Sequence, residues 1–199
     1  MLRLPCLLVA IGSLTLAADY AAWAQKNPDG SWTATAEAAV KESALPSAAP
    51  QDAEKFCPAY LKLAVGDRTK FWVVLLSAIA KPESNFNPKE QYKEAFDDAS
   101  GKAVVSRGLL QISIESANQK RYGCGIKKDE DLHDPATNLQ CGVKILAAWV
   151  EADKVIATYQ DDKSPRGGGR YWSTLRESHK SFAATKTYLN GLPFCQKAK

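Results

Sequence analysis

The chain has 199 residues, of which 45% are hydrophobic and 24% are charged, with a formal net charge of +4 at pH 7. This charge is too small to indicate a nucleic-acid partner, and no basic stripe interleaved with aromatic residues accompanies it. The composition is that of an ordinary globular protein, with room for one core of usual size.

Residues 1–24 have the order of a secretory signal peptide. Arg3 precedes an apolar run from Leu4 to Ala18, and Ala22-Trp-Ala24 supplies a small-x-small cleavage site. We expect cleavage after Ala24 and export, which would make the protein periplasmic or secreted. The apolar run is too short and too interrupted for a membrane span, and no later stretch is long enough, so we expect none.

Residues 25–56 are rich in Ala, Ser, Pro and polar residues. Asn27-Pro-Asp-Gly30 is typical of a turn, and Pro46 and Pro50 interrupt the second half of the segment. We predict an N-terminal arm or linker here, and then a single domain over residues 57–199 of roughly 140 residues.

The apolar segment from Phe71 to Ala80 predicts a helix that is buried on most of its surface. Pro82 and the turn formers beyond it predict that this helix ends within a residue or two of Glu83. A carboxylate there faces the negative end of the helix dipole and an apolar surface, and both raise its pKa. Glu83 is therefore a candidate general acid, although a lone glutamate near a helix end is more commonly a solvated surface residue.

The segment after Pro88 contains a turn and then an unusual apolar run. Ala99-Ser-Gly-Lys102 marks the turn, and Ser106-Arg-Gly-Leu-Leu-Gln-Ile-Ser113 comes after it. The amide of Gln111 within this run would be costly to bury unless it had hydrogen-bond partners. We predict a helix over residues 109–121.

The last third of the chain is also expected to be largely helical. Asp134-Pro135 is typical of a helix start with proline at the first position, and residues 138–158 have apolar side chains at helical spacing. Arg166-Gly-Gly-Gly169 lacks the preceding strand and the Lys-Ser/Thr pair of a phosphate-binding loop, so we interpret it as a flexible loop.

Export leaves four of the five cysteines in the mature chain: Cys57, Cys124, Cys141 and Cys195. An even number in an oxidising compartment indicates two disulfides, for which three pairings exist. We favour Cys124 with Cys141, which closes a short loop, and Cys57 with Cys195, which ties together the ends of the domain. A zinc site is the alternative, but no Cys-x-x-Cys pair is present and the chain has only two histidines.

The order of several short motifs resembles the lysozyme-like lytic transglycosylases, the family of soluble lytic transglycosylases and goose-type lysozymes that share the SLT domain. The motifs are Glu83-Ser84, Gly108-Leu-Leu-Gln111, Asp134-Pro135, Asn138-Leu139 and Gly142. The resemblance covers about residues 71–149. It implies a mainly α, lysozyme-like α+β domain in which a small hairpin or loop over residues 89–105 flanks a substrate cleft.

The same resemblance implies roles for individual residues. Gln111 and the Ser106 hydroxyl would bind sugar groups, and Gly108 would allow the backbone to approach the substrate closely. Ser106 could equally cap a helix before Leu109. Ser84, next to the acid, would belong to the substrate-binding residues and orient the acid, or it would simply cap a turn.

The chain departs from the family at the expected Ala-Tyr-Asn motif, whose tyrosine approaches the catalytic acid. It offers Ala157-Thr-Tyr159-Gln or Gly169-Arg-Tyr171-Trp instead. We favour Tyr171, because it comes after a glycine-rich loop and precedes a helix-like segment, and keep Tyr159 as the second candidate. An aromatic residue that packs the core would explain either one. The departure suggests a distinct subfamily.

Glycosidic cleavage needs a carboxylic acid that is still protonated near neutral pH, and Glu83 is the candidate. If a second carboxylate holds a water molecule, the reaction is hydrolysis. Asp97 and Asp98 are the first candidates for that role and Glu94 is a third, although each of them could be a loop surface residue. Without such a base, the 6-hydroxyl of the sugar attacks and an anhydro product forms, as in lytic transglycosylases.

The sequence therefore predicts a monomeric enzyme that cleaves the MurNAc–GlcNAc backbone of peptidoglycan as a lytic transglycosylase, with Glu83 as its single catalytic acid and base. The first alternative is a hydrolytic muramidase, either a general one or one specific for modified (deacetylated) wall glycan. The second is an inactive scaffold that binds the wall. No cofactor, metal ion or nucleic acid is expected in any of the three.

Overall fold

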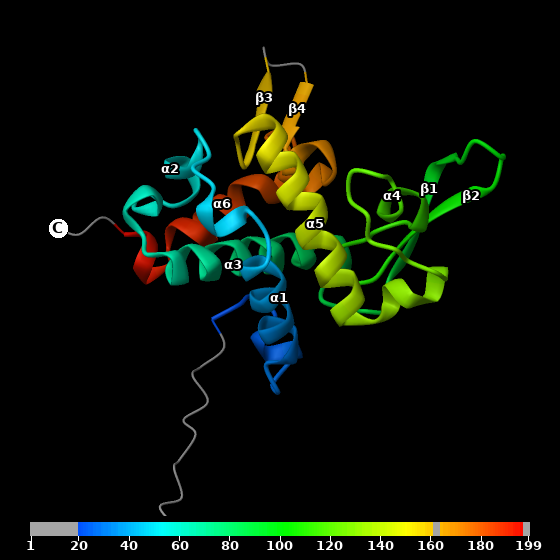
Figure 1. The fold of residues 1–199 in the computed structure, drawn as a ribbon, viewed down its shortest axis with the longest axis horizontal. Coiled ribbons are helices and arrows are strands. Elements are labelled where there is room, and N and C mark those ends of the chain that lie inside the picture. The colour runs from blue at the N-terminus through cyan, green and yellow to red at the C-terminus, as the bar shows by residue number, and fades with distance from the viewer. Residues whose placement is uncertain (1–19, 161–163, 197–199) are drawn as a thin grey trace, which may run out of the picture.

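The computed structural model describes residues 20–160 and 164–196 (Figure 1). Its longer elements are α1 (Ser31–Lys41), α2 (Ala53–Phe56), α3 (Val65–Ser84), β1 (Gln91–Asp97), β2 (Ala103–Arg107), α4 (Ile114–Ala117), α5 (Pro135–Asp153), β3 (Ala157–Gln160), β4 (Ser164–Gly167) and α6 (Lys180–Asn190). Short 3-10 helices connect them: η1 (Ala24–Lys26), η2 (Leu45–Ser47), η3 (Tyr60–Lys62), η4 (Asp129–His133), η5 (Gly168–Arg170), η6 (Ser173–Leu175) and η7 (Pro193–Cys195). The predicted mainly helical domain with a small hairpin is confirmed.

Helix α3 runs through the centre of the molecule, with α1 and α6 packed against it (Figure 1). Every side chain from Phe71 to Ala80 is buried, as the apolar run predicts. The helix ends at Ser84 because Asn85 takes a left-handed conformation with φ 51°. Glu83 therefore lies in the last turn, which confirms the predicted end. The helix begins at Val65, earlier than the apolar run alone indicated.

Residues 25–56 are not an arm or linker. Helix α1 packs against both α3 and α5 and buries Ala36 and Val40. Further along, the Asp52 carboxylate accepts hydrogen bonds from the backbone N–H groups of Ile156 (2.6 Å) and Ala157 (2.9 Å). Alanine side chains make a close-packed helix face without a strong hydropathy signal, which explains why composition alone suggested a linker.

The core also includes residues ahead of the predicted cleavage site. Trp23 is 0% exposed, and its indole Nε1 donates to Thr33 Oγ1 at 2.8 Å. The backbone N–H of Ala22 donates to Ser77 Oγ at 2.9 Å on α3. Cleavage after Ala24 would remove these contacts from the folded domain, so the packing moves the expected boundary upstream.

We therefore predict that the exported protein begins between Thr15 and Tyr20, where Thr-Leu-Ala-Ala offers small residues to a signal peptidase. The measurement is the intact mass of the protein purified after export. A form truncated at Ala24 should unfold at lower urea concentration, because loss of a buried tryptophan costs about 3–5 kcal/mol. A mature chain that begins at Gln25 with unchanged stability would contradict this expectation.

Residues 109–121 do not form the predicted helix. Helix α4 covers Ile114–Ala117 alone, and the preceding segment is a turn in which Gly108 (φ 76°) and Gln111 (φ 48°) both have left-handed backbone. Leu110 is nevertheless completely buried there, together with its apolar neighbours. Burial in a turn leaves the same run of apolar residues as burial in a helix, so the sequence pattern could not separate the two.

Helix α5 begins at Pro135, as predicted. The Asp134 carboxylate caps it by accepting a hydrogen bond from the Thr137 N–H at 2.9 Å. It ends at Asp153 and not at residue 158, because Lys154 takes a left-handed conformation with φ 57° and the chain then turns into the β3–β4 hairpin.

The glycine-rich segment is a packed turn and not a flexible loop. The Gly167 N–H donates to Asp153 Oδ2 at 2.7 Å, and φ of Gly167 is 60°. A Cβ atom at this position would collide with the carbonyl groups of Val155 and Ile156. Only glycine allows the chain to pass this close to the backbone of Val155 and Ile156, just before β3.

Both predicted disulfides are confirmed. Cys57 is bonded to Cys195 and joins α2 to η7, while Cys124 is bonded to Cys141 and joins the loop after α4 to α5. None of the helices in the described ranges has the length and apolar character that a membrane crossing requires.

Candidate active site

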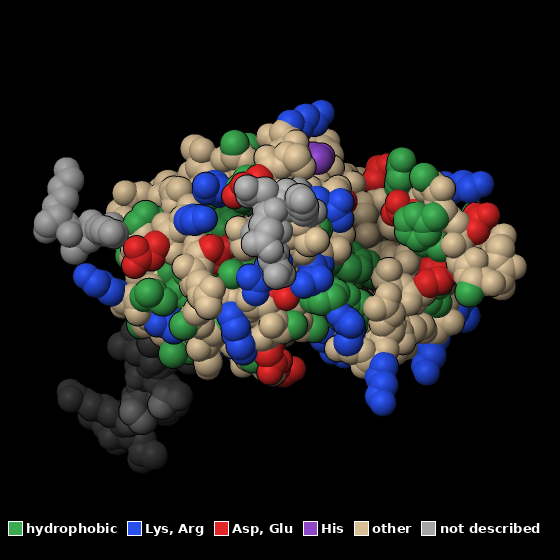
Figure 2. Space-filling model, turned by 90° about the horizontal axis from the view of Figure 1, so that it is seen from above, with side chains coloured by type: hydrophobic (Ala, Val, Ile, Leu, Met, Phe, Trp, Pro, Cys, Tyr) green, Lys and Arg blue, Asp and Glu red, His purple; other side chains and the backbone are tan. Residues whose placement is uncertain are grey.

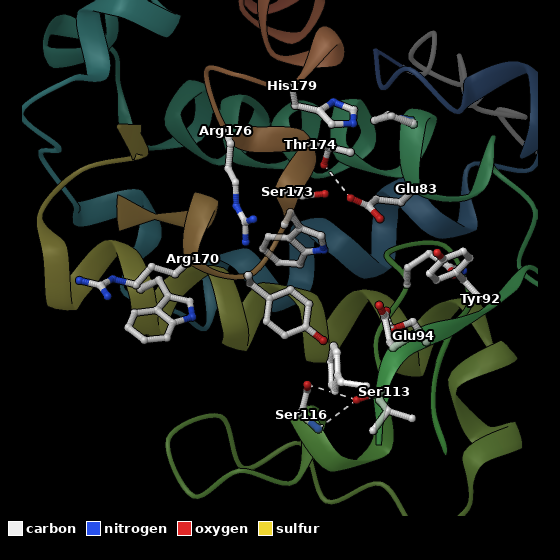
Figure 3. A pocket seen from close by; sticks show the side chains of 18 of the residues that line it. Glu83, Tyr92, Glu94, Ser113, Ser116, Arg170, Ser173, Thr174, Arg176 and His179 are labelled. Atoms are coloured by element: carbon white, nitrogen blue, oxygen red, sulfur yellow. Dashed lines mark hydrogen bonds between the residues drawn. The ribbon is translucent and has the colours of Figure 1, made fainter. Parts of the chain in front are cut away.

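A cleft of about 840 Å³ lies beside the end of α3. One wall comes from α3 and the β1–β2 hairpin, and the other comes from residues 170–179 (Figure 3). Acidic and basic side chains are interspersed over the face in Figure 2, and apolar side chains gather at the hairpin end, where Tyr92 and Phe96 are exposed. Of the residues in the sequence motifs, Glu83 and Gln111 line this cleft.

Glu83 points into this cleft from the last turn of α3 (Figure 3). Its side chain is half-buried, and its Oε1 accepts a hydrogen bond of 2.6 Å from Thr174 Oγ1. Burial raises the pKa of Glu83 to about 7; the Thr174 hydrogen bond opposes this rise, and the nearby charge of Glu94 adds to it. A carboxyl group with this pKa is substantially protonated at neutral pH and can donate a proton.

Glu94 points into the same space from β1 (Figure 3). The β1–β2 register shifts between Lys93 and Asp97, so Glu94 lies at an irregularity of the hairpin. Its Oε1 accepts a hydrogen bond of 2.6 Å from the hydroxyl of Ser106 on β2. Ser106 lines the cleft, where its hydroxyl holds the Glu94 carboxylate in place, and a role of Ser106 in sugar binding stays a prediction.

The structure does not bring Asp97 and Asp98 to the cleft. Asp97 is exposed at the end of β1. Asp98 is bound within the hairpin turn, where it accepts hydrogen bonds from the N–H groups of Ser100 (2.8 Å) and Lys102 (2.9 Å). Hydrogen bonds from Ser100 and then from Lys102 lower the pKa of Asp98. Glu94 is the one of the three candidate carboxylates that faces Glu83.

Ser84 and Gly108 do not line the cleft, although the resemblance gave both a place near the sugar. The buried hydroxyl of Ser84 donates to Leu109 O at 2.9 Å. A Cβ atom on Gly108 would collide with Leu132 O and with the amide of Asn138. These two residues therefore hold the Gly-Leu-Leu-Gln turn in position, and other side chains line the cleft.

Gln111 lines the cleft and keeps one polar atom free. Its Nε2 donates to Gly108 O (2.9 Å) and to Glu90 O (3.2 Å). Its Oε1 is buried, and no residue in the described ranges donates to it. Because an unmet buried acceptor is costly, this oxygen is suited to a donor group on a ligand.

Asn138 fixes the turn that presents Gln111. It is completely buried, and its Oδ1 accepts from the Leu110 N–H at 2.9 Å. Its Nδ2 donates to Arg107 O and to Leu132 O, each at 2.9 Å. Both polar atoms of this amide are hydrogen-bonded within the protein, so the role of the Asn-Leu motif is structural.

Tyr171, the favoured one of the two candidate tyrosines, lines the cleft. Its ring packs edge-on against Trp172 at 4.8 Å and Tyr122 at 6.2 Å between centroids. Burial raises the pKa of its hydroxyl above the usual range, and the charge of Glu83 is a smaller contribution in the same direction. Tyr159 lies in β3, and its side chain is outside the part of the chain that the structure describes.

Several lining residues were not identified from the sequence: Glu90, Tyr92, Phe96, Arg170, Thr174 and Arg176. Tyr92, Glu94 and Phe96 occupy every second position of β1. Residues at this spacing lie on one face of a strand, so the sequence did contain a pattern that indicated a shared face on the cleft. Thr174 had no such sequence signal, because it is distant from Glu83 in the sequence and contacts it only in the folded domain.

Comparison with known proteins identifies the family. The model described as "Transglycosylase SLT domain" matches residues 63–160. The solved structure titled "Bd0314 DslA wild-type form 2" is 40% identical to this chain, with a TM-score of 0.84, and the match covers 90% of this chain and 100% of that one.

Two glutamate-to-glutamine mutants of DslA match as well. One is 39% identical with a TM-score of 0.84, and the other is 40% identical with a TM-score of 0.83 over 88% of this chain and 97% of that one. No curated protein sequence matches the chain. Identity at this level over nearly the whole domain, together with the match to the SLT domain, means that the chain belongs to the lytic transglycosylase (SLT) family, with its lysozyme-like fold.

Proposed function

We propose that this protein hydrolyses the MurNAc–GlcNAc backbone of peptidoglycan as a muramidase. Membership in the SLT family supports peptidoglycan as the substrate and glycosidic cleavage as the reaction. The observation that favours hydrolysis over transglycosylation is the presence of Glu94 in the cleft beside Glu83, where only one carboxylate is needed to form an anhydro product.

In this mechanism Glu83 is the general acid. Its pKa of about 7 leaves a proton available for the leaving-group oxygen, and the Thr174 hydroxyl fixes the orientation of the carboxyl group. Since a glycosidic oxygen is a poor leaving group, protonation by a positioned acid is the first requirement of the reaction.

Glu94 is the second carboxylate in this proposal. Ser106 binds one of its oxygens, which leaves the other free to accept a hydrogen bond from an attacking water molecule. The two DslA mutants replace glutamates that are eleven residues apart, and Glu83 and Glu94 have the same separation. This shared spacing supports a paired role for the two carboxylates.

The remaining lining residues suit a sugar chain. Tyr92 and Phe96 expose 61% and 62% of their surface along the hairpin wall, where aromatic faces can pack on sugar rings. The free Oε1 of Gln111 can accept a hydrogen bond from an N–H group of an amino sugar.

A preference for deacetylated glycan is a second proposal about the same cleft. Glu83, Glu90 and Glu94 all lie on the wall formed by α3 and the hairpin, and the unpaired Gln111 atom beside them is also an acceptor. A wall made of acceptors and carboxylates binds a free ammonium group better than a neutral acetamido group.

The test is mass spectrometry of the soluble products from acetylated and deacetylated walls, digested side by side. Hydrolysis gives reducing ends, whereas transglycosylation gives anhydro ends that are lighter by one water molecule. Predominant anhydro ends would restore the lytic transglycosylase assignment. Intact walls in both digests would leave the binding scaffold as the function.

Replacement of Glu94 by Gln is expected to slow wall cleavage by roughly a hundredfold or more, because the water molecule loses its base. Asp97→Asn is the matched control, since it removes a carboxylate from the same strand outside the cleft, and its rate should stay within about twofold of wild type. Equal rates for Glu94→Gln and Asp97→Asn would contradict a base at Glu94.

The disulfides and the leader sequence support a periplasmic or secreted location. Fractionation of cells that express the full chain, with measurement of the free thiols in each fraction, would test this proposal.

A further inference from the structure

Arg176 lines the same cleft as Glu83 and Glu94, on the wall formed by residues 170–179, and in Figure 3 its side chain lies on the other side of Ser173 from Glu83. The side chain is half-buried, and its Nε donates to Gly169 O at 3.0 Å. Its two terminal nitrogens form no ion pair or hydrogen bond with any residue in the described ranges. This guanidinium is thus held through its Nε atom alone, and the N–H donors of its two terminal nitrogens are available.

Arg170, the other arginine that lines the cleft, has a different environment. Its Nε donates to Asp153 Oδ2 at 2.6 Å, and its Nη2 donates to Asp153 Oδ1 at 3.1 Å. Its charge is therefore neutralised within the protein. Of the two guanidinium groups on this wall, Arg170 is paired with a carboxylate, whereas Arg176 has both terminal nitrogens available and no carboxylate partner among the described residues.

Charge is divided between the two walls. Glu83, Glu90 and Glu94 lie on the side formed by α3 and the hairpin, whereas Arg176 lies opposite with no carboxylate within ion-pair distance in the described residues. A carboxylate on the substrate is repelled by the first wall and attracted by the second. A guanidinium binds a carboxylate through two parallel hydrogen bonds. Neutral hydroxyl groups of a sugar can be bound without placing a charged, partly desolvated side chain beside them.

We propose that Arg176 binds a carboxylate of the muramyl substituent of the glycan. This rests on peptidoglycan as the proposed substrate, and it makes the enzyme selective for muramyl glycan over a neutral amino-sugar polymer. The carboxylate belongs either to the lactyl group itself or to the peptide stem attached to it. Both present the same chemistry to the guanidinium.

Equilibrium binding in the Glu83→Gln background tests this without cleavage. Three glycan strands serve as probes: strands with peptide stems, peptide-free strands with a free lactyl carboxylate, and peptide-free strands with that carboxylate converted to an amide. Added Arg176→Gln should weaken binding of the carboxylate-bearing strands by roughly tenfold, and Arg176→Lys should retain part of the affinity. Both variants should bind the amidated strand as the Glu83→Gln protein does.

Lys180→Gln is the matched control. It removes one positive charge from an exposed site four residues further along that does not line the cleft, so it reports non-specific attraction to an anionic polymer. Loss of affinity for peptide-bearing strands alone identifies the stem as the source, and loss for peptide-free acidic strands identifies the lactyl group.

Equal weakening of all three strands by Arg176→Gln, or equal weakening by Lys180→Gln, would overturn the proposal. If Arg176→Gln does not fold, the affinities of the Glu83→Gln protein for the three strands are compared with one another. Equal affinity for all three strands would also overturn the proposal. Binding that tracks the carboxylate, in a protein whose wild-type form leaves walls intact, would refute the muramidase and keep the carboxylate site.

Discussion

Replacement of Glu83 by Gln is expected to lower the rate of wall cleavage by at least about a thousandfold, because the leaving-group oxygen loses its proton donor. The amide keeps the shape of the side chain and can still accept the 2.6 Å hydrogen bond from Thr174. A zymogram on purified walls, together with rate measurement on soluble strands, checks this. Clearing by Glu83→Gln at the wild-type rate would refute the assignment of the acid.

The same variant should be more stable than wild type at alkaline pH. The pKa of Glu83 in the folded protein, about 7, lies above the ordinary value of 4.5. The folded state therefore binds this proton more tightly than the unfolded state, so the stability it contributes is present below pH 4.5 and is lost as the pH rises through 7.

Urea unfolding at two pH values measures this effect. At about pH 8 Glu83→Gln should raise the free energy of unfolding by about 2 kcal/mol, and at about pH 4.5 the difference should nearly vanish. Wild-type cleavage should also decline as the pH rises through about 7, since the acid is then deprotonated. A difference in stability that does not change with pH would mean that Glu83 is not protonated by burial.

Gly108→Ala adds only one methyl group, but it is expected to lower the free energy of unfolding by about 3 kcal/mol or more. Its φ of 76° is unfavourable for alanine, and the added Cβ would collide with Leu132 O and the side chain of Asn138. Those two groups also hold the turn that carries Gln111, so glycan binding should weaken as well.

Gly101→Ala provides the matched control for the backbone effect. Gly101 has a similar φ of 81°, but a Cβ there has open space around it. This variant should lose only about 1 kcal/mol, which is the cost of the left-handed conformation. Similar losses for the two variants in urea unfolding would show that the contact at Gly108 is not tight.

The parts of the structure that could be predicted are those set by local chemistry. The turn formers after Pro82 predicted that α3 ends within a residue or two of Glu83, and the positions of the four cysteines favoured the pairing that the structure has. The ordered motifs identified the family. In each case the determining residues are close in sequence or belong to a small set of possible pairings.

The parts that could not be predicted depend on contacts between distant segments or on backbone conformation. A left-handed φ at Gln111 converts an apolar run into a turn, and glutamine rarely takes this conformation. The choice of Glu94 over Asp97 depends on the register of a hairpin with an irregular strand. Thr174 reaches Glu83 only after the chain has passed through α5 and the second hairpin.

The hydrogen bond from Ser84 to Leu109 O has a mechanical consequence. It couples the tip of the central helix, with its proton donor, to the turn that carries the amide of Gln111, so both move as one rigid block. Widening or narrowing the groove around glycans of different bulk must then come from the hairpin. Tolerance for decorated substrates in this protein should be altered by changing the residues of that hairpin, while the block formed by the end of α3 and the Gln111 turn stays fixed.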